Sequence, residues 1–411
     1  MFTRDHRVAA PVIVALHVCA AQAVAAELTA PPGFAVSVFH DGVGAVARHV
    51  VVRDNGDVLI ARRDGVLVAL RDGDGDGRAD RVEERRLPIT TGLAIHDGHL
   101  YFSDTTSVSR VMLDDALMPQ GDAETVVSGF PEQRSHASKT LAFDREGNLY
   151  VNVGAPSNAC QREARTPGSP GQRPCPQLER QAGIWRFPAG AGGLEQTDGE
   201  RYVTGTRNVL AMDWNPAADA LFFTIHGRDQ LSSLWPELFD AHDNAEMPAE
   251  EFHRAEPGAD YGWPYTFFDP RTGRRLVAPE YGGNGEQEAE AGRYRPPLHA
   301  FPGHWAPNDM VFYWGDQFPE RYRGGAFIAW HGSWNRAPLP QEGYRVTFLP
   351  FADGAPAGPP EDFLTGFQAG EEVTDPDRAS YRPMGLGIGP DGSLYLTETQ
   401  AGRVWRVVYR S

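Results

Sequence analysis

Short apolar segments recur along the chain in pairs, and a tight turn separates the two members of each pair. In one clear example, apolar runs between Val50 and Ile60 flank the turn Asp54-Asn55-Gly56-Asp57. Turns of the Asp-Gly or Asn-Pro type between apolar runs are typical of antiparallel β-hairpins. The pattern occurs six times, over residues 50–60, 92–102, 140–151, 209–223, 309–329 and 385–396.

These repeats predict an all-β fold, a six-bladed β-propeller. Third strands follow several hairpins, at residues 65–70, 183–187 and 402–407. Two strands alone bury too little surface to be stable, whereas four-stranded sheets packed radially around an axis bury a core. The unequal spacing indicates insertions, mostly in repeats three to five. A β-sandwich is the alternative, but it would not explain one pattern recurring six times.

The first 26 residues are typical of an export signal. Arg4 and Arg7 precede an apolar stretch from Pro11 to Ala26, which ends in small residues that suit cleavage. This stretch is too short to cross a bilayer. We predict a signal peptide over residues 1–26, one propeller domain over residues 27–411, and a periplasmic or secreted protein without a membrane span.

Cysteine usage agrees with export. Cys160 and Cys175 remain after removal of the signal, and the segment between them is rich in proline, glycine and arginine. Such a composition indicates an irregular surface loop. We predict a disulfide that closes this loop and stabilises the fold by about 3 kcal/mol in an oxidising compartment.

Candidate chemistry gathers where propeller geometry predicts a channel mouth. The first strand of each blade lines the central channel, so the residues just before these strands meet at one end of it. These residues are His136, Lys139, Arg207, Asn208, Asn308 and Arg382. Their basic character suits a compact anion. It contrasts with a net charge of −17, which argues against nucleic acid and anionic membranes as partners.

Six short motifs follow one another along successive blades, at residues 136–141, 206–208, 226–231, 258–265, 331–336 and 382–385. Together they resemble those of the pyrroloquinoline-quinone-dependent sugar dehydrogenases, particularly the sorbosone dehydrogenase-like branch. The resemblance spans most of the chain, from Gly33 to Arg410. It implies a propeller that holds pyrroloquinoline quinone (PQQ) and calcium as cofactors.

The resemblance also implies roles for individual residues. PQQ carries three carboxylates and an ortho-quinone, so its site needs guanidinium or ammonium donors. Arg207 and Asn208 would contact the quinone side, and Arg382 would contact a carboxylate. His136 would be the general base that takes the hydroxyl proton of the substrate while hydride passes from the same carbon to the quinone.

Two calcium sites are predicted. By resemblance, the backbone carbonyls of Gly227 and Arg228 would hold calcium against the quinone, where it polarises the carbonyl that accepts hydride. A second, structural site is predicted from the spacing of acids, which matches a twelve-residue calcium loop. Those acids are Asp72, Asp74, Asp76, Asp80 and Glu83. An acidic, solvated turn between strands is the alternative.

The chain departs from the related glucose dehydrogenases at two positions. Those enzymes place a lysine against the cofactor in the fifth blade, where this chain has His331. Arg336 or Lys139 would then supply the missing positive charge. Those enzymes also have an aspartate that supports the catalytic histidine, where this chain has residues 153–156, Val-Gly-Ala-Pro.

The leading hypothesis is a quinoprotein dehydrogenase that oxidises an aldose or a sugar aldehyde. The chain has no C-x-x-C-H haem motif, so electrons would pass to a separate acceptor, a cytochrome or a quinone. One alternative is a calcium-dependent lactonase, which needs Glu, Asp and Asn ligands to one metal in the channel. Another is a non-catalytic propeller that binds a glycan or protein at the cell envelope. Residues 258–265 either wall the substrate site or form an aromatic packing corner.

Overall fold

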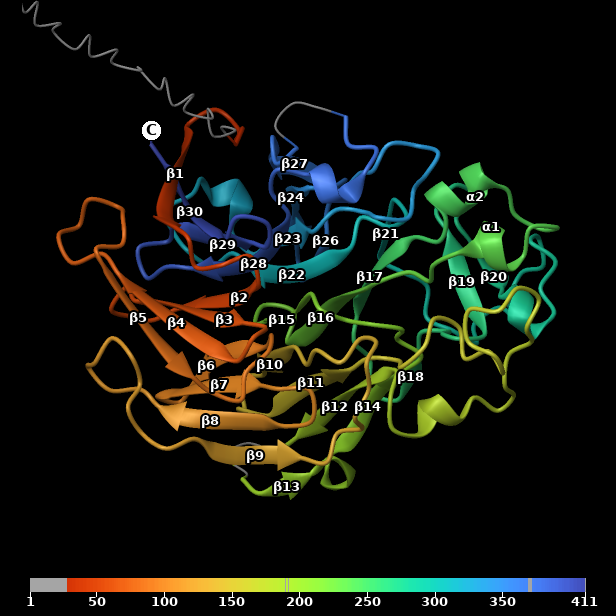
Figure 1. Ribbon diagram of the computed structural model, residues 1–411, viewed down its shortest axis with the longest axis horizontal. Coiled ribbons are helices and arrows are strands. Elements are labelled where there is room, and N and C mark those ends of the chain that lie inside the picture. The colour runs from red at the N-terminus through yellow and green to blue at the C-terminus, as the bar shows by residue number, and fades with distance from the viewer. Residues whose placement is uncertain (1–27, 189, 191, 369–371, 411) are drawn as a thin grey trace, which may run out of the picture.

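The computed structural model describes residues 28–188, 190, 192–368 and 372–410. The predicted signal peptide lies outside the described residues. Six antiparallel sheets, each with four main strands, form a six-bladed β-propeller (Figure 1). The predicted fold is confirmed.

The first three blades follow the order of the chain from the channel outward. Blade 1 contains β2 (Ala47–Val52), β3 (Val58–Arg62), β4 (Val66–Arg71) and β5 (Arg81–Arg86). Blade 2 contains β6 (Leu93–His96), β7 (His99–Ser103), β8 (Val108–Met112) and β9 (Glu124–Ser128). Blade 3 contains β10 (Leu141–Phe143), β11 (Leu149–Val153), β12 (Gly183–Phe187) and β14 (Glu200–Thr204). The short strands β13 (Leu194–Glu195) and β18 (Ala259–Asp260) add parallel edges to blades 2 and 3.

The last three blades carry the longer insertions. Blade 4 contains β15 (Met212–Asn215), β16 (Ala220–Ile225), β17 (Glu250–Arg254) and β21 (His299–Phe301). Blade 5 contains β22 (Pro307–Phe312), β23 (Ala326–Trp330), β24 (Arg345–Leu349) and β27 (Glu361–Leu364). Blade 6 contains β28 (Pro383–Ile388), β29 (Leu394–Glu398), β30 (Arg403–Tyr409) and β1 (Phe34–Asp41).

The insertions lie outside the ring of blades. Those of blade 4 form α1 (Leu231–Leu234), α2 (Ala241–Glu246) and a hairpin of β19 (Thr266–Asp269) and β20 (Arg274–Val277), all at one side of the propeller (Figure 1). Blade 5 adds a small hairpin of β25 (Phe351–Ala352) and β26 (Ala355–Pro356). Short 3-10 turns lie at Pro176–Glu179, Gln196–Asp198, Pro279–Tyr281, Glu320–Tyr322 and Pro376–Arg378.

The innermost strands close a ring around the channel. They contact one another in the order β2, β6, β10, β15, β22, β28 and back to β2. The six predicted hairpins are these strands with their second strands, and the predicted third strands are β4, β12 and β30. Turn chemistry explains the repeat. In blade 3 the Asp144 carboxylate accepts hydrogen bonds from the N–H groups of Glu146 and Asn148, at 3.0 and 2.8 Å, and Gly147 takes a left-handed φ of 81°.

Buried carboxylates join neighbouring innermost strands. Asp213 in β15 accepts a hydrogen bond from the N–H of Phe312 in β22, at 2.8 Å. Asp309 in β22 accepts one from the N–H of Leu386 in β28, at 2.9 Å. Burial raises the pKa of Asp213 to about 7 and raises that of Asp309 as well. These bonds satisfy backbone groups that face the channel and fix the spacing of blades 4 to 6.

The N-terminal strand completes blade 6. β1 pairs with β30 from Phe34 opposite Tyr409 to Asp41 opposite Arg403, and the two strands lie side by side in Figure 1. The repeat pattern assigned no partner to residues 34–41, because the pairing joins opposite ends of the chain. The first and last strands therefore close the ring together.

The aromatic segment at residues 258–265 packs inside the fold. Tyr261 is buried and donates its hydroxyl to the carbonyl of Arg254, at 2.7 Å. Trp263 is also buried and donates Nε1–H to the carbonyl of Asn158, at 2.9 Å. These contacts favour the packing interpretation of the segment.

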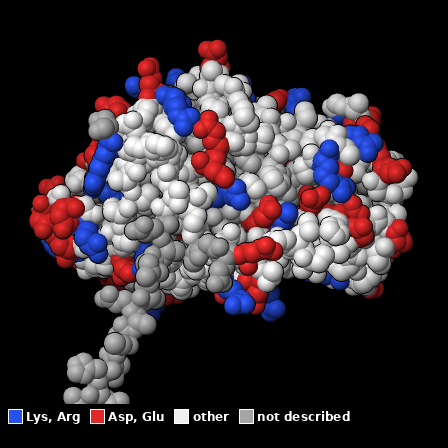
Figure 2. All heavy atoms as spheres, turned by 90° about the horizontal axis from the view of Figure 1, so that it is seen from above, with Lys and Arg blue, Asp and Glu red and all other residues white. Residues whose placement is uncertain are grey.

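The surface carries acidic and basic side chains in a mixed pattern over the face that Figure 2 shows. Within the described part of the chain, no helix is long and apolar enough to cross a membrane.

Candidate active site

Two adjoining cavities lie at the mouth predicted from the strand order. The first has a volume of about 410 Å³ and is lined mainly from blades 3 to 6. The second has a volume of about 480 Å³ and is lined mainly from blades 1 to 3. His136, Asn208 and His331 line both cavities, so the two form one continuous site.

The structure brings most of the predicted mouth residues together. Arg207 and Arg382 line the first cavity with the three shared residues. Asn308 lines the second. The spatial convergence follows from propeller geometry, while the roles assigned to these residues stay predictions.

Backbone contacts alone orient His136. Its Nδ1 lies 2.6 Å from the carbonyl oxygen of Ala155. Because a carbonyl only accepts, Nδ1 carries the hydrogen and Nε2 keeps its lone pair. Burial, and next the positive charge of Arg207, lower the pKa of His136 to about 3. The imidazole is therefore neutral, and in the empty site it is a weaker base than a free histidine. The partner of Nδ1 is therefore a backbone carbonyl and not a carboxylate.

Arg207 is buried and held from two sides. Its Nη2 donates to the Asp229 carboxylate at 2.8 Å and to Asn158 Oδ1 at 3.1 Å. Its Nη1 donates to the carbonyl of Gly227 at 2.8 Å. Its Nε is buried without a partner in the described chain. The guanidinium is thus fixed in place with one donor unused.

A chain of amide and imidazole contacts crosses the floor of the mouth. Asn208 Nδ2 lies 3.5 Å from His226 Nδ1, and His226 Nε2 lies 3.2 Å from Asn308 Oδ1. Asn308 Nδ2 contacts the sulfur of Met384 at 3.1 Å. Asn208 Oδ1 is buried without a partner among the described residues. Asn208 itself lines both cavities, so this unsatisfied acceptor belongs to a residue at the mouth.

His331 and Arg382 line the first cavity from blades 5 and 6. His331 Nε2 lies 2.8 Å from the hydroxyl of Thr399. Arg382 donates to the backbone carbonyls of His331 and Gly332, at 3.1 and 2.6 Å. Burial and then the charge of Arg382 lower the pKa of His331 well below its usual range. Because it stays neutral, His331 does not replace the lysine charge of the glucose dehydrogenases.

The structure does not bring Lys139 or Arg336 to the mouth. Lys139 is 0% exposed, and its ammonium donates to the carbonyl of Ala137 at 2.7 Å. Arg336 donates to the carbonyl of Ala245 at 2.7 Å and holds the blade 5 loop against blade 4. Neither is among the described residues that line the two cavities. Their side chains point into the packing between blades. The position of a residue along a strand does not indicate where its side chain points.

Of the two carbonyl positions predicted for site calcium, one belongs to a residue that lines the first cavity. Gly227 lines it, and its carbonyl accepts the hydrogen bond from Arg207. A carbonyl oxygen has two lone pairs, so this bond leaves one for a cation. The Arg228 side chain turns away and forms a buried ion pair with Glu280.

Several cavity residues were not singled out from the sequence. His226 and Asp229 lie within the 226–231 motif, which could have indicated them. Glu250 and His304 follow long insertions, so no local pattern marked them. Glu250 accepts hydrogen bonds from the N–H groups of Gly227 and Ala306, at 2.9 and 3.3 Å, and burial raises its pKa to about 8.

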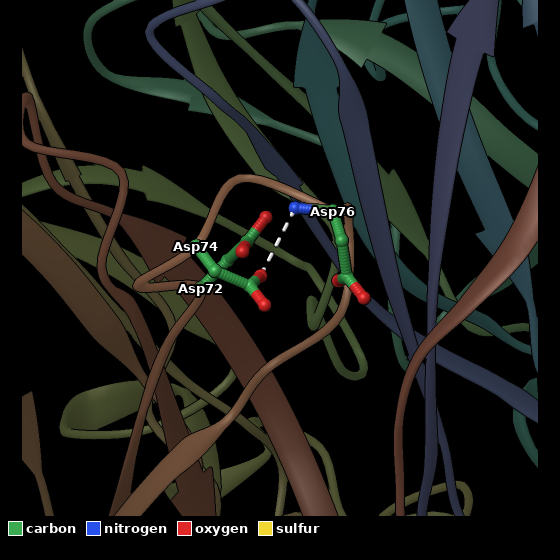
Figure 3. Close-up of side chains that lie close together, drawn as sticks. All are labelled: Asp72, Asp74 and Asp76. Carbon is green, nitrogen blue, oxygen red and sulfur yellow. Dashed lines mark hydrogen bonds between the residues drawn. The ribbon is translucent and has the colours of Figure 1, made fainter.

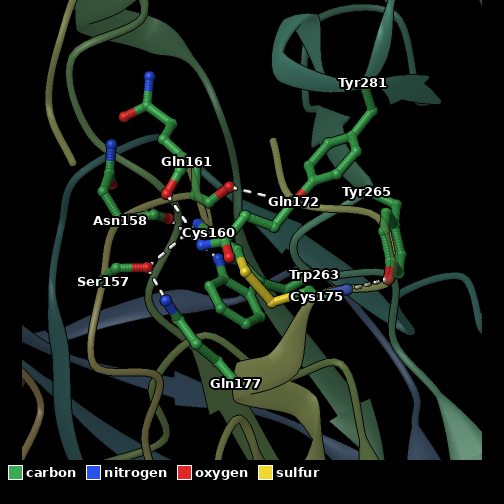
Figure 4. Close-up of a disulfide and its surroundings, with 11 residues drawn as sticks. Ser157, Asn158, Cys160, Gln161, Gln172, Cys175, Gln177, Trp263, Tyr265 and Tyr281 are labelled. Atoms are coloured by element: carbon green, nitrogen blue, oxygen red, sulfur yellow. Dashed lines mark hydrogen bonds between the residues drawn. A yellow bond between two sulfur atoms is a disulfide. The ribbon is translucent and has the colours of Figure 1, made fainter. Parts of the chain in front are cut away.

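The predicted disulfide is confirmed and supports the site. Cys160 and Cys175 are bonded and lie next to Trp263 (Figure 4). They share a buried apolar cluster with Ala155. Ala155 is the residue that orients His136. The disulfide loop therefore holds the backbone on which the candidate base depends.

The acidic loop between β4 and β5 brings three of its five predicted ligands together. Carboxylate oxygens of Asp72, Asp74 and Asp76 lie within 4.8 Å of one another (Figure 3). Asp80 instead accepts a hydrogen bond from the N–H of Gly73, at 3.1 Å. Glu83 is not part of this group: it lies in β5 and pairs with Arg81. A strand follows this loop, so the twelfth position extends away from it.

The fold and the site define a class, a six-bladed propeller with a cavity of histidine, arginine and asparagine at one mouth of its channel. A family model described as TrAA12-like matches residues 28–410, and the chain belongs to this family. The resemblance to PQQ-dependent sugar dehydrogenases is confirmed, and the sorbosone dehydrogenase-like branch stays a prediction.

Several known proteins are similar to this chain. The PQQ-dependent pyranose dehydrogenase of Coprinopsis cinerea is 28% identical over 92% of the chain, which spans 54% of that relative. The holo PQQ domain of the C. cinerea enzyme has a TM-score of 0.75 at 20% identity and covers 93% of this chain and 97% of its own. A calcium structure of Trichoderma reesei family AA12 has a TM-score of 0.76 at 18% identity and covers 94% and 98%. At these identities the solved structures show the fold.

Proposed function

We propose that the protein is a PQQ-dependent dehydrogenase that oxidises an aldose or a sugar aldehyde at the channel mouth. The observation that carries the proposal is the convergence of His136, Arg207, Asn208 and Arg382 on one cavity in a chain of the TrAA12-like family. The named relatives from Coprinopsis cinerea support the cofactor and the substrate class.

The residues present fit the cofactor. A ligand with three carboxylates and a quinone needs cationic donors, and Arg207 and Arg382 both face the first cavity. Arg207 Nε and Asn208 Oδ1 are buried polar atoms without partners in the described chain. The Gly227 carbonyl retains a lone pair for calcium. Arg207, Asn208 and Arg382 would therefore hold PQQ, and the carbonyls of Gly227 and Arg228 would hold calcium.

When bound, the quinone would supply the hydride acceptor and calcium would polarise it. The chain itself would position the sugar and move its proton. His136 would accept the hydroxyl proton at Nε2, because Nδ1 is committed to the Ala155 carbonyl. Trp334, which lines the first cavity and is 53% exposed, would offer an apolar face to the ring of the sugar.

A calcium-dependent lactonase is the second candidate. It requires several acidic ligands to one metal within the channel. Among the described residues, the one group of three or more metal-ligating side chains that lie close enough together is Asp72, Asp74 and Asp76, on the outer loop of blade 1. The mouth instead gathers arginine, histidine and asparagine, so the dehydrogenase is favoured.

The proposed setting is the periplasm or the exterior of the cell, after cleavage of the predicted signal peptide. Reduced cofactor would then be reoxidised by a separate cytochrome or quinone. Neither the acceptor nor the setting is needed for the chemistry at the mouth.

The proposal is tested with purified apo-protein, PQQ, calcium and a redox dye, using a panel of aldoses. Saturable PQQ binding and sugar-dependent dye reduction are expected. Absence of PQQ binding would overturn the proposal. Hydrolysis of lactones with calcium alone would establish the second candidate instead.

A further inference from the structure

The second cavity at the mouth is lined by three arginines and by no acidic residue. Arg48 and Arg63 come from blade 1, and Arg134 comes from the loop that leads into blade 3. Thr90, Thr105 and Ser138 add hydroxyl groups to the same lining. The first cavity differs, because Asp229 and Glu250 contribute carboxylates there.

These arginines lack carboxylate partners. Arg48 donates a single hydrogen bond, to the neighbouring carbonyl of Ala47 at 2.8 Å. Within the described chain, Arg63 and Arg134 make no side-chain hydrogen bond or ion pair. Arg207, by contrast, is neutralised by Asp229. Arg48 is half-buried, whereas Arg63 and Arg134 are exposed, so this cavity carries positive charge without carboxylate partners in a protein with a net charge of −17.

The positive charges also act on one another. Burial and then the charge of Arg63 lower the pKa of Arg48 to about 10. Arg48 and Arg63 both contribute to the lowered pKa of His331, which lines the two cavities. At the half-buried Arg48, desolvation and the like charge of Arg63 together disfavour the charged guanidinium in the empty protein. An anionic ligand would relieve this repulsion.

We propose that the second cavity is a subsite for the carboxylate of an acidic sugar, so that the substrate class is the uronic acids and sugars that end in them. This inference rests on the proposed function for its place in a reaction. Arg63 and Arg134 would bind the carboxylate, and the hydroxyls of Thr90, Thr105 and Ser138 would bind the ring hydroxyls.

The position of His136 explains why a sugar acid fits better than the cofactor here. His136 stands at the boundary of the two cavities. A sugar whose reacting carbon lies at His136 has the first cavity on one side and the arginines on the other. The residues proposed for PQQ, Arg207 and Arg382, line the first cavity. Asn208, which is also proposed to hold PQQ, lines both cavities, so PQQ would reach their boundary and the arginines of the second cavity would be left for the remainder of the substrate.

The test compares two sugars that differ only at carbon 6, D-glucose and D-glucuronate, with the PQQ- and calcium-loaded protein. We expect a lower KM for glucuronate than for glucose. Arg63→Gln together with Arg134→Gln should raise the KM for glucuronate about tenfold or more, with kcat and the glucose KM little changed. Added salt should also raise the KM of the wild-type protein for glucuronate, because salt screens the attraction between the arginines and the carboxylate. Arg145→Gln is the control, since Arg145 is an exposed residue in a turn of blade 3.

A second readout does not depend on activity. Glucuronate, but not glucose, should raise the Tm of the apo-protein, and the double variant should lose this effect. If no sugar is oxidised while this shift persists, the proposed function fails and the subsite stands. If the double variant weakens PQQ binding and leaves the preference for glucuronate intact, the arginines serve the cofactor and the inference is overturned. Equal Tm shifts with both sugars would also overturn it.

Discussion

At the scale of single residues, close backbone packing determines where the candidate base sits. His136 has a left-handed φ of 52°. A Cβ added to Gly154 would lie 2.6 Å from the Cβ of His136, so only glycine fits beside it. The Ala155 carbonyl then fixes the ring. Backbone groups therefore determine both the position and the orientation of the His136 side chain.

His136→Asn should abolish most of the proposed activity without unfolding the protein. Asparagine tolerates left-handed backbone better than most residues, so the turn is retained. Loss of a general base should lower kcat about 100-fold or more in the dye-reduction assay. His242→Ala, at an exposed position in α2, is the matched control. Activity at the wild-type level in His136→Asn would remove this residue as the base and leave the class of enzyme untouched.

Burial of Lys139 should make the free energy of unfolding depend on pH. Burial lowers its pKa to about 7, against a small opposing effect of Asp104, whereas an unfolded lysine titrates near a pKa of about 10.4. Between these values the unfolded chain binds more protons, so the contribution of Lys139 to stability rises with pH. Lys139→Met should be more stable than wild type at pH 7, and the difference should shrink towards pH 10. Urea unfolding at both pH values measures it, and a difference independent of pH would contradict it.

The sequence predicted the residues of the mouth in part. His136, Arg207, Asn208 and Arg382 were found because each precedes an innermost strand. The same rule failed for Lys139, since position along a strand does not give the direction of a side chain. Arg48 and Arg63 belong to blade 1, which carries none of the family-like motifs, and Arg134 lies just before the motif at residues 136–141, so no motif included these arginines.

At the scale of elements, the disulfide loop connects stability with the site. The Cys160–Cys175 bond packs on Ala155, and Asn158 in the same segment binds Arg207. Replacing both cysteines by serine should lower the free energy of unfolding by about 3 kcal/mol and reduce activity. Thermal unfolding of wild type with and without reductant checks this. The double variant should be insensitive to reductant, and an unchanged Tm in reduced wild type would contradict the prediction.

The acidic loop between β4 and β5 gives a prediction for metal removal. If Asp72, Asp74 and Asp76 hold a structural calcium, a chelator should lower the Tm and added calcium should restore it. Asp72→Asn together with Asp74→Asn should remove this response while PQQ binding stays intact. Glu83→Gln is the control, because Glu83 lies in β5. A calcium response that depends on Glu83 would contradict the ligand set.

At the scale of the whole molecule, the sequence predicts pairings between strands that are close along the chain but not pairings between distant strands. Six hairpins were predicted because turn residues and apolar runs lie within about a dozen residues of each other. The closing pair of β1 and β30 joins positions at opposite ends of the chain, and such a pairing has no local signature. The sequence therefore predicts the blades better than it predicts what holds the ring shut.

Closure of the ring by β1 leads to a prediction about global stability. Phe34 packs edge-on against Phe318, Tyr322 and Phe363, at centroid distances of 4.8, 5.3 and 5.0 Å, and so joins blade 6 to blade 5. Phe34→Ala should lower the free energy of unfolding by about 3 kcal/mol, the lower end for a phenylalanine, because the ring is only partly buried.

Ser37→Ala is the control for this change, since Ser37 is an exposed residue of the same strand. Urea unfolding followed by tryptophan fluorescence measures both variants. If β1 closes the ring, Phe34→Ala should shift the whole transition, because blades that lose their closing strand lose contacts with both neighbours. A separate, early transition confined to blade 6 would instead mean that the other five blades are stable without closure. The folding unit would then be the blade rather than the ring.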